Sequence, residues 1–171
     1  HHAVDGYIAT LVQNGHKVAI ADQVEDPRVA RGLVRREIVR VITPGTLADQ
    51  VDPDTNNFLI AVVAVPAGMG LAACDASTGE LLATQVLGDG AAKVISEEIG
   101  RISPSECIYP GYDDAASAKE SCPAQGEFVS YPRPRKHFEL AHAEDTLLKQ
   151  FDVTSLEGFG AGNMDLAVRA A

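Results

Sequence analysis

The carboxylates beside the longest apolar segment are the first candidates for chemistry. Asp52 and Asp54 precede the apolar residues 58–65, and Asp75 comes after this segment. These three carboxylates are candidates for a metal-dependent nuclease site. Such enzymes bring carboxylates together on two divalent cations, and the first, central strand normally supplies one of them. Residues 58–65 read FLIAVVAV and contain no carboxylate. Asp52 and Asp54 lie beside Pro53 in a segment typical of a solvated turn, which argues against a two-metal site.

Arginines form the second set of candidates. The concentrated positive charge of the chain lies at Arg28, Arg31, Arg35, Arg36 and Arg40. Guanidinium groups pair with phosphate and release counterions from nucleic acid on binding, so this run could line a DNA backbone. Charge runs more often form a solvated face, and acidic residues lie close by in the sequence. The residues alone therefore leave both interpretations open and favour the solvated face.

The remaining reactive residues do not form a recognisable site. The five histidines show no ligand spacing, because His137 and His142 are too far apart in sequence to share one helix face. The three cysteines, Cys74, Cys107 and Cys122, lack C-x-x-C spacing and are typical of free thiols in a reducing cytoplasm. The glycine-rich residues 158–162 lack the Lys-Ser/Thr of a nucleotide-binding loop, so a turn before a helix is the better interpretation.

Charge and composition narrow the classes of partner. The chain has 171 residues, 46% apolar, with a net charge of −10. Residues 1–46 carry a net charge of +1 and residues 47–171 a net charge of −11. The second part is therefore a poor candidate for binding a phosphate backbone. No apolar run approaches the length of a membrane span, and no signal sequence is evident.

Hydrophobic spacing predicts the elements that must position these residues. Residues 4–14 predict a helix and residues 17–24 a strand, and residues 36–43 predict a strand in which Arg40 points away from its apolar neighbours. Residues 28–35 are ambiguous between a short helix and a loop. Residues 43–46, Thr-Pro-Gly-Thr, predict a tight turn at a domain boundary near Thr46.

The second part predicts an α/β domain with a mixed sheet and flanking helices. Three strands in a meander (58–65, 70–77, 80–87) precede a helix at 91–102, a strand at 106–109, a weak helix at 113–120 and a strand at 127–131. Helices at 143–151 and 163–171 follow. Before the first of them, the basic residues Arg133, Arg135 and Lys136, interleaved with Pro132 and Pro134, predict an extended loop. This order is that of an RNase H-like fold.

Two blocks of the first part carry a family resemblance. Residues 2–7, HAVDGY, and residues 16–46, HKVAIADQVEDPRVARGLVRREIVRVITPGT, resemble the end of the mismatch-binding domain of the MutS family. The remainder resembles the connector domain of that family. The resemblance implies that residues 1–46 are the C-terminal part of a small α/β mismatch-binding domain, residues 47–57 a linker, and residues 58–171 an RNase H-like connector domain cut at its last helix.

The resemblance also implies a function. MutS proteins bind mismatched duplex DNA as homodimers in the cytoplasm, hydrolyse ATP with Mg²⁺, and recruit MutL. Neither the Phe-x-Glu motif for mismatches nor a G-x-x-x-x-G-K-[ST] loop for ATP occurs in this sequence. The resemblance therefore implies a non-catalytic connector without a cofactor of its own, which links the mismatch-binding domain to the ATPase body and offers a surface to MutL. Arg40, and with less weight Arg36, are its implied contacts to DNA phosphate.

Two rival functions remain open on the sequence. A stand-alone RNase H-like nuclease or resolvase predicts Mg²⁺- or Mn²⁺-dependent cleavage that is lost in Asp75→Asn. A protein-binding module without nucleic-acid function predicts no binding to duplex DNA even at low salt.

Overall fold

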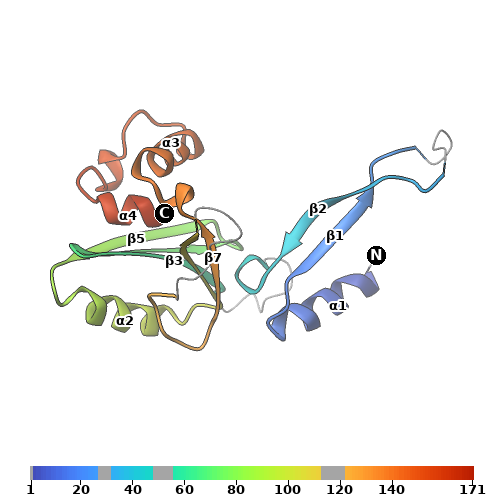
Figure 1. The fold of residues 1–171 in the computed structure, drawn as a ribbon, viewed down its shortest axis with the longest axis horizontal. Helices are drawn as coiled ribbons and strands as arrows, with labels where there is room; N and C mark the ends of the chain where they lie inside the picture. The colour runs from blue at the N-terminus through green and yellow to red at the C-terminus, as the bar shows by residue number, and fades with distance from the viewer. Residues whose placement is uncertain (1, 27–31, 48–55, 113–121) are drawn as a thin grey trace.

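The computed structural model describes residues 2–26, 32–47, 56–112 and 122–171, which form two parts (Figure 1). The small unit, residues 2–47, contains helix α1 (His2–Gln13) and an antiparallel ribbon of β1 (Val18–Gln23) and β2 (Arg36–Ile42). The sheet domain, residues 56–171, contains a five-stranded sheet with helices on both faces. A 3-10 turn, η1 (Pro44–Thr46), lies between the two parts and contacts β3 and β6 of the sheet.

The small unit has a core of its own. Ile8 and Val12 are one helical turn apart on α1 and are both buried, and they pack with Ile42 and Leu47. Gly15, with φ +80°, follows the helix in the left-handed conformation that ends many helices. The predicted helix and both predicted strands of this region are confirmed, with the helix beginning at His2.

A β-bulge breaks the alternation of the ribbon. Ile20 pairs with Arg40 and Ala21 with Ile38, so Val39 is an extra residue on β2. Directly paired residues share a face of a ribbon, and an extra residue shifts the alternation by one. Arg36 and Arg40 therefore lie on opposite faces of the ribbon, although four residues separate them in the sequence.

The sheet has the strand order β5-β4-β3-β6-β7. Strands β3 (Phe58–Val65), β4 (Gly68–Asp75) and β5 (Glu80–Leu87) form the predicted antiparallel meander, and β6 (Glu106–Tyr112) and β7 (Val129–Pro134) add in parallel on the other side. A meander followed by parallel strands gives the mixed sheet of an RNase H-like fold, which confirms the predicted fold class.

Helices cover both faces of the sheet (Figure 1). Ile60 and Val62 of β3 pack under α2 (Ala91–Ile102), while Ala61 and Val63 pack on the opposite face with α4 (Asp165–Ala170). Both faces of β3 are therefore buried, which explains why this strand has no polar residue. Helix α3 (Leu140–Phe151) packs against α4.

Helix α4 lies unusually close to the sheet. A Cβ atom built on Gly70 of β4 would lie 1.9 Å from the carbonyl oxygen of Leu166, so only glycine fits there. The side-chain oxygen of Gln85 on β5 accepts hydrogen bonds from the backbone N–H groups of Leu166 (2.9 Å) and Ala167 (3.4 Å). Gln85 thereby satisfies amide groups in the first turn of α4 that have no partner within the helix.

The later elements differ from the sequence prediction in their bounds. Strand β7 runs from Val129 to Pro134 instead of 127–131, so most of the predicted basic loop is strand, followed by the 3-10 turn η2 (Arg135–Phe138). Proline is tolerated because β7 is an edge strand. Strand β6 is longer than predicted, and α3 begins before its predicted start at residue 143. The last helix is shorter than predicted, because α4 runs from Asp165 to Ala170 instead of 163–171; a separate turn, η3 (Glu157–Phe159), precedes it. The predicted helix at 113–120 lies outside the described residues.

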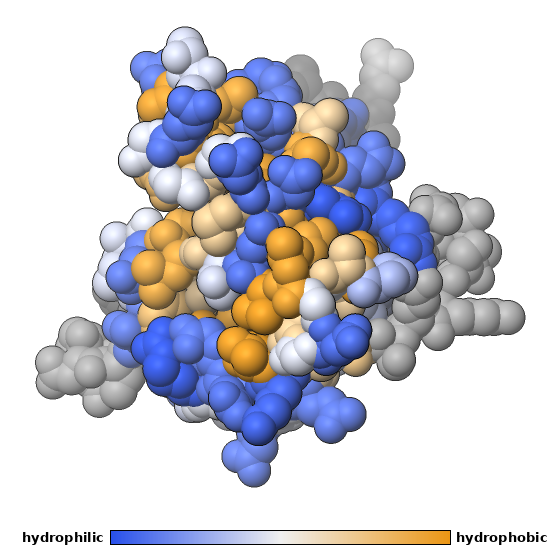
Figure 2. Space-filling view, turned by 90° about the vertical axis from the view of Figure 1, so that its left-hand side faces the viewer, coloured by the Kyte–Doolittle hydropathy of each residue, from blue (hydrophilic) through white to orange (hydrophobic). Residues whose placement is uncertain are grey.

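The outer surface beside α3 and β5 is mixed in polarity. Figure 2 shows the side of the molecule that lies at the left of Figure 1, where apolar patches are interrupted by hydrophilic side chains. Exposed apolar residues include Leu82 and Leu87 on β5, Phe151 on α3 and Phe159 on η3. Single exposed apolar residues are normal on a folded surface. Among the described residues, no helix is both long and apolar enough to cross a bilayer.

Candidate functional site at the domain junction

The predicted DNA-binding arginines lie on the ribbon, away from the sheet domain. Arg36 pairs with Gln23 near one end of the ribbon, and Arg40 pairs with Ile20 nearer to the junction. Both side chains are exposed. The prediction that Arg40 points away from its apolar neighbours is wrong in part, because Arg40 pairs with Ile20 and shares a face with Ile42, the face on which α1 packs. Arg28 and Arg31 lie outside the described residues.

Among the described residues, carboxylates do not gather as a two-metal nuclease requires. Asp52 and Asp54 lie outside the described residues. Asp75 is buried at the end of β4, where its Oδ1 accepts hydrogen bonds from the backbone N–H (2.8 Å) and hydroxyl (2.6 Å) of Ser77. These donors, the Ser77 hydroxyl first, lower the pKa of the Asp75 carboxyl. The carboxylate therefore acts as an anchor for the β4–β5 turn.

The described residues also contain no group of three histidines, cysteines or acids placed to hold a metal ion. The structure does bring His137 and His142 together, with ring centroids 5.5 Å apart, because η2 turns the chain into α3. Burial is the main cause that lowers the pKa of His137, with a smaller effect from Lys136. All three cysteines are free thiols, as predicted.

The contacts that join the two parts centre on Glu106. This residue begins β6, is 1% exposed, and accepts a hydrogen bond at its Oε2 from the backbone N–H of Gly45 (3.0 Å) in η1. A Cβ atom on Gly45 would lie 2.9 Å from the Cβ of Leu59 and 3.0 Å from that of Glu106. The absence of a side chain at Gly45 therefore lets the backbone of the small unit reach the buried carboxylate.

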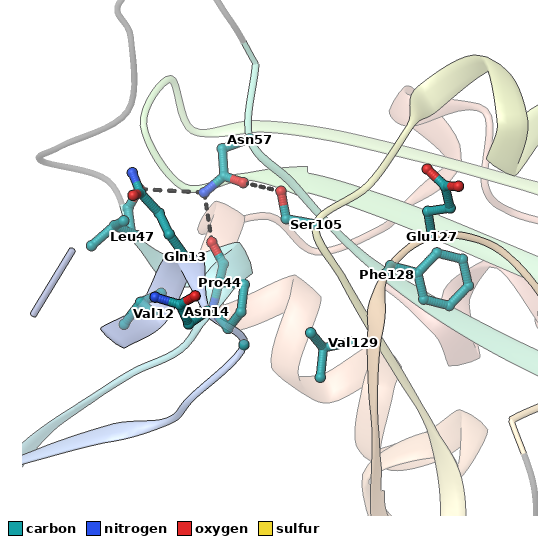
Figure 3. Close-up of a pocket in the computed structure, with 11 residues that line it drawn as sticks. Val12, Gln13, Asn14, Pro44, Leu47, Asn57, Ser105, Glu127, Phe128 and Val129 are labelled. Atoms are coloured by element: carbon teal, nitrogen blue, oxygen red, sulfur yellow. Dashed lines mark hydrogen bonds between the residues drawn. The ribbon is translucent and has the colours of Figure 1, made fainter. Parts of the chain in front are cut away.

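A second contact uses the side chain of Asn57, which is also buried. Its Nδ2 donates to the carbonyl oxygens of Pro44 (2.8 Å) and Leu47 (3.3 Å), and its Oδ1 accepts from the hydroxyl of Ser105. Asn57 thus connects both ends of η1 to the residue before β6 (Figure 3). Thr43 and Thr46 complete η1, because the backbone N–H of Thr43 donates to the hydroxyl of Thr46 (2.9 Å).

A third contact joins the start of β1 to β7. The ammonium of Lys17 lies 3.2 Å from the centroid of the Tyr131 ring, and the Tyr131 hydroxyl donates to the carbonyl oxygen of Gly15 (3.3 Å). Burial is the main cause that lowers the pKa of Lys17, and the charge of Arg133 adds to it. A cation over a ring face is a favourable contact in a partly desolvated place.

A cleft of about 640 Å³ lies beside these contacts. Its walls come from the end of α1, from η1 and from the segment that leads into β7 (Figure 3). Two polar residues that line it are hydrogen-bonded within the protein, since Asn57 bonds to Ser105 and to η1. The cleft therefore marks the seam between the small unit and the sheet domain.

The sequence prediction missed the residues that make this junction. Glu106, Asn57 and Tyr131 carried no recognisable motif, and their partners lie far away in the sequence. The one signal in this region was the Thr-Pro-Gly-Thr turn, which was predicted as a boundary and hinge. A lone carboxylate beginning an otherwise apolar strand is a cue to a buried partner.

The fold and the junction together define a class: two-part α/β proteins in which an RNase H-like domain holds a smaller helix-and-ribbon unit through buried polar contacts. Comparison with known families makes the assignment specific. Residues 1–51 match the model of MutS domain I, and residues 57–171 match that of MutS domain II. The chain belongs to the MutS family of DNA mismatch repair proteins.

Individual relatives agree with this assignment. The chain is 43% identical to the DNA mismatch repair protein MutS of Symbiobacterium thermophilum and 40% identical to that of Syntrophomonas wolfei. It is also 43% identical to MutS of Desulfatibacillum aliphaticivorans. Each comparison covers 100% of this chain but only 19–20% of the relative, so the chain spans about one fifth of the length of these proteins.

Proposed function

We propose that this part of MutS is a mechanical connection between the DNA-contacting ribbon and the rest of the mismatch repair protein. The observation that carries the proposal is the buried hydrogen bond from the Gly45 amide to Glu106. A buried carboxylate is costly unless it is paired, so the two parts are stabilised in one arrangement. In this role the sheet domain links the mismatch-binding domain to an ATPase body and takes no part in catalysis.

The ribbon supplies the contact to DNA in this proposal. Arg36 and Arg40 lie on the small unit, whose net charge is positive, while the sheet domain is strongly acidic. Contacts of this kind position a protein on the phosphate backbone without reading bases. Mismatched duplex DNA is accordingly a partner of the whole protein, with recognition supplied by residues outside this chain.

The remaining partners in this proposal, a second copy of the protein, MutL, and ATP with Mg²⁺, come from membership of the MutS family. The relatives are named as DNA mismatch repair proteins, and the proposal includes a homodimeric, cytoplasmic protein that recruits MutL through the connector. ATP and Mg²⁺ belong to the ATPase body, because this sequence has no nucleotide-binding loop.

A DNA-binding experiment separates this proposal from its rivals. The chain is titrated against a labelled duplex of about 30 base pairs, with and without one mismatch, at low and moderate salt. We expect weak binding that weakens as salt is added and shows no preference for the mismatch. Cleavage of the duplex that requires Mg²⁺ and is lost in Asp75→Asn would identify a nuclease instead. No binding at the lowest salt would favour a protein-binding module.

The mechanical part of the proposal is tested at Gly45. In Gly45→Ala the new methyl group meets Leu59 and Glu106, so we expect the small unit to separate from the sheet domain. Amide hydrogen exchange should then increase at η1 and at the start of β6, while the sheet core stays protected. Gly6→Ala is the matched control, because a Cβ atom on Gly6 in α1 meets nothing within 4 Å. Equal exchange in the two variants would contradict a mechanical junction at Gly45.

A further inference from the structure

Two of the three free thiols lie next to each other. Cys107 is on β6 and is fully buried, and its Sγ lies 3.6 Å from the Sγ of Cys122, which is half-buried on the segment that leads to β7. Both pack in the core beneath α2. The third thiol, Cys74, lies on β4 and has no thiol partner among the described residues.

The surroundings of Cys122 stabilise a thiolate. The hydrogen-bonded contact with Cys107 is the largest cause that lowers the pKa of Cys122, to about 7, and the backbone N–H of Ala124 and the hydroxyl of Ser130 act in the same direction. The bond to Cys122 and burial both raise the pKa of Cys107. Burial, together with the charge of Asp75, raises the pKa of Cys74. Of the three thiols, Cys122 is the one best prepared to react as a nucleophile.

We propose that Cys107 and Cys122 form a redox-active dithiol site, in which Cys122 reacts first with an oxidant and Cys107 closes a reversible disulfide. Exposure assigns the order, since Cys122 is reachable from solvent and Cys107 is not. A disulfide requires sulfurs about 2 Å apart, so the two thiols must approach by a small local shift. Cys74 takes no part.

Hydrogen peroxide serves as the oxidant. The Cys122 thiolate attacks one peroxide oxygen, the O–O bond breaks, and hydroxide leaves with the electron pair, so Cys122 becomes a sulfenic acid. The Cys107 thiol then gives its proton to the hydroxide, and its sulfur attacks the sulfur of Cys122. The S–S bond forms as the S–O bond breaks, and the departing hydroxide takes up the proton that Cys122 released to solvent when it ionised, which gives the second water. In sum, two thiols and one peroxide give one disulfide and two waters.

The product would change the edge of the sheet beside the junction. The disulfide covalently joins β6 to the segment that precedes β7, and β6 and β7 themselves pair through the hydrogen bonds of the sheet. Glu106, which holds Gly45, is the immediate neighbour of Cys107 on β6. The site therefore lies beside the junction contact, on the opposite face of the same strand.

Peptide mapping tests the proposal in the chain itself. The folded chain is treated with peroxide, quenched, blocked with N-ethylmaleimide and digested with trypsin, which separates residues 102–119 from residues 120–135. We expect these two peptides to be cross-linked, with a mass loss of about 2 Da relative to the separate thiol peptides, while Cys74 carries the maleimide. Dithiothreitol should release both peptides.

Control variants show whether oxidation is specific to the Cys107–Cys122 pair of the folded chain. Cys74→Ser should keep the cross-link, and Cys107→Ser should leave a sulfenic acid on Cys122 that dimedone traps. In urea the same chain should lose its preference for the Cys107–Cys122 disulfide and form all three possible cysteine pairs. The proposal fails if Cys74 is oxidised as fast as Cys122 in the folded chain. It fails equally if the cross-link forms only in urea.

Discussion

The backbone N–H of Gly45 donates to the Oε2 of Glu106 at 3.0 Å, across 61 residues of sequence. Gly45 belongs to the turn η1 that ends the small unit, and Glu106 begins the first parallel strand of the sheet domain. Both residues are buried. This buried pair is therefore central to the contact between the two parts, beside the contacts made by Asn57 and Tyr131.

Glu106→Ala should destabilise the chain more than any exposed acid on α2. The substitution leaves the buried Gly45 N–H without its acceptor, which costs about 2–3 kcal/mol of the free energy of unfolding. Glu106→Gln keeps an acceptor oxygen and should cost less. Urea unfolding measures both, with Glu97→Ala as control, since Glu97 is exposed and faces Lys93 at 3.9 Å. Similar losses at Glu106 and Glu97 would disprove the junction role.

Gly70→Ala should have a large effect on the packing of α4. Its new methyl group would lie 1.9 Å from the Leu166 carbonyl oxygen, so the helix must move away from the sheet. We expect a loss of about 3 kcal/mol or more in urea unfolding, with faster amide exchange at 165–170. Gly100→Ala, in α2 with nothing within 4 Å, should instead stabilise by up to ~1 kcal/mol.

Ser77→Ala should change how stability depends on pH. Hydrogen bonds from Ser77 hold the pKa of Asp75 below its usual value of 3.8. A carboxyl with a lowered pKa in the folded state adds stability above its unfolded pKa and loses it as the pH falls through the folded pKa. The variant should therefore be less stable at neutral pH by about 1–2 kcal/mol.

Below pH 3.8 the difference between wild type and Ser77→Ala should shrink as Asp75 becomes protonated. Urea unfolding at a series of pH values measures it. Ser96→Ala, on the exposed side of α2, serves as control and should give a difference independent of pH. A constant difference for Ser77→Ala would show that the hydroxyl does not act through the carboxylate.

Arg36→Ala and Arg40→Ala should each weaken binding to duplex DNA without changing any sequence preference. If each side chain contacts one phosphate, each substitution should lower the slope of log affinity against log salt by about 1. The two residues lie on opposite faces of the ribbon, so the effects should add in the double variant. Arg101→Ala on α2 is the control. An unchanged slope in the double variant would remove these arginines from the interface.

The sequence predicted the layers of the sheet domain well, because apolar spacing dominates there. Residues 58–65 and 80–87 are strands and residues 91–102 a helix at the predicted bounds. Strand β7 was misplaced because Pro132 and Pro134 normally indicate a loop, and only its position at the sheet edge makes them compatible with a strand. Local patterns do not reveal which strand becomes an edge.

The site was harder to predict, because its contacts are long-range. No spacing rule connects Glu106 to Gly45, or Tyr131 to Lys17. The bulge at Val39 is equally hidden, since it depends on how β2 pairs with β1. It places Arg36 on the opposite face from Arg40, whereas simple alternation would put both predicted DNA contacts on one face.

The shape of the molecule gives the small junction a large mechanical reach. The β1–β2 ribbon extends outward from η1, with its far end well away from the sheet (Figure 1). A slight rotation about the Gly45–Glu106 contact therefore swings the ribbon tip through a much wider arc, as a lever arm does. Conversely, a large displacement of the far end of the ribbon would produce only a small displacement, with a larger force, at Glu106, the first residue of β6.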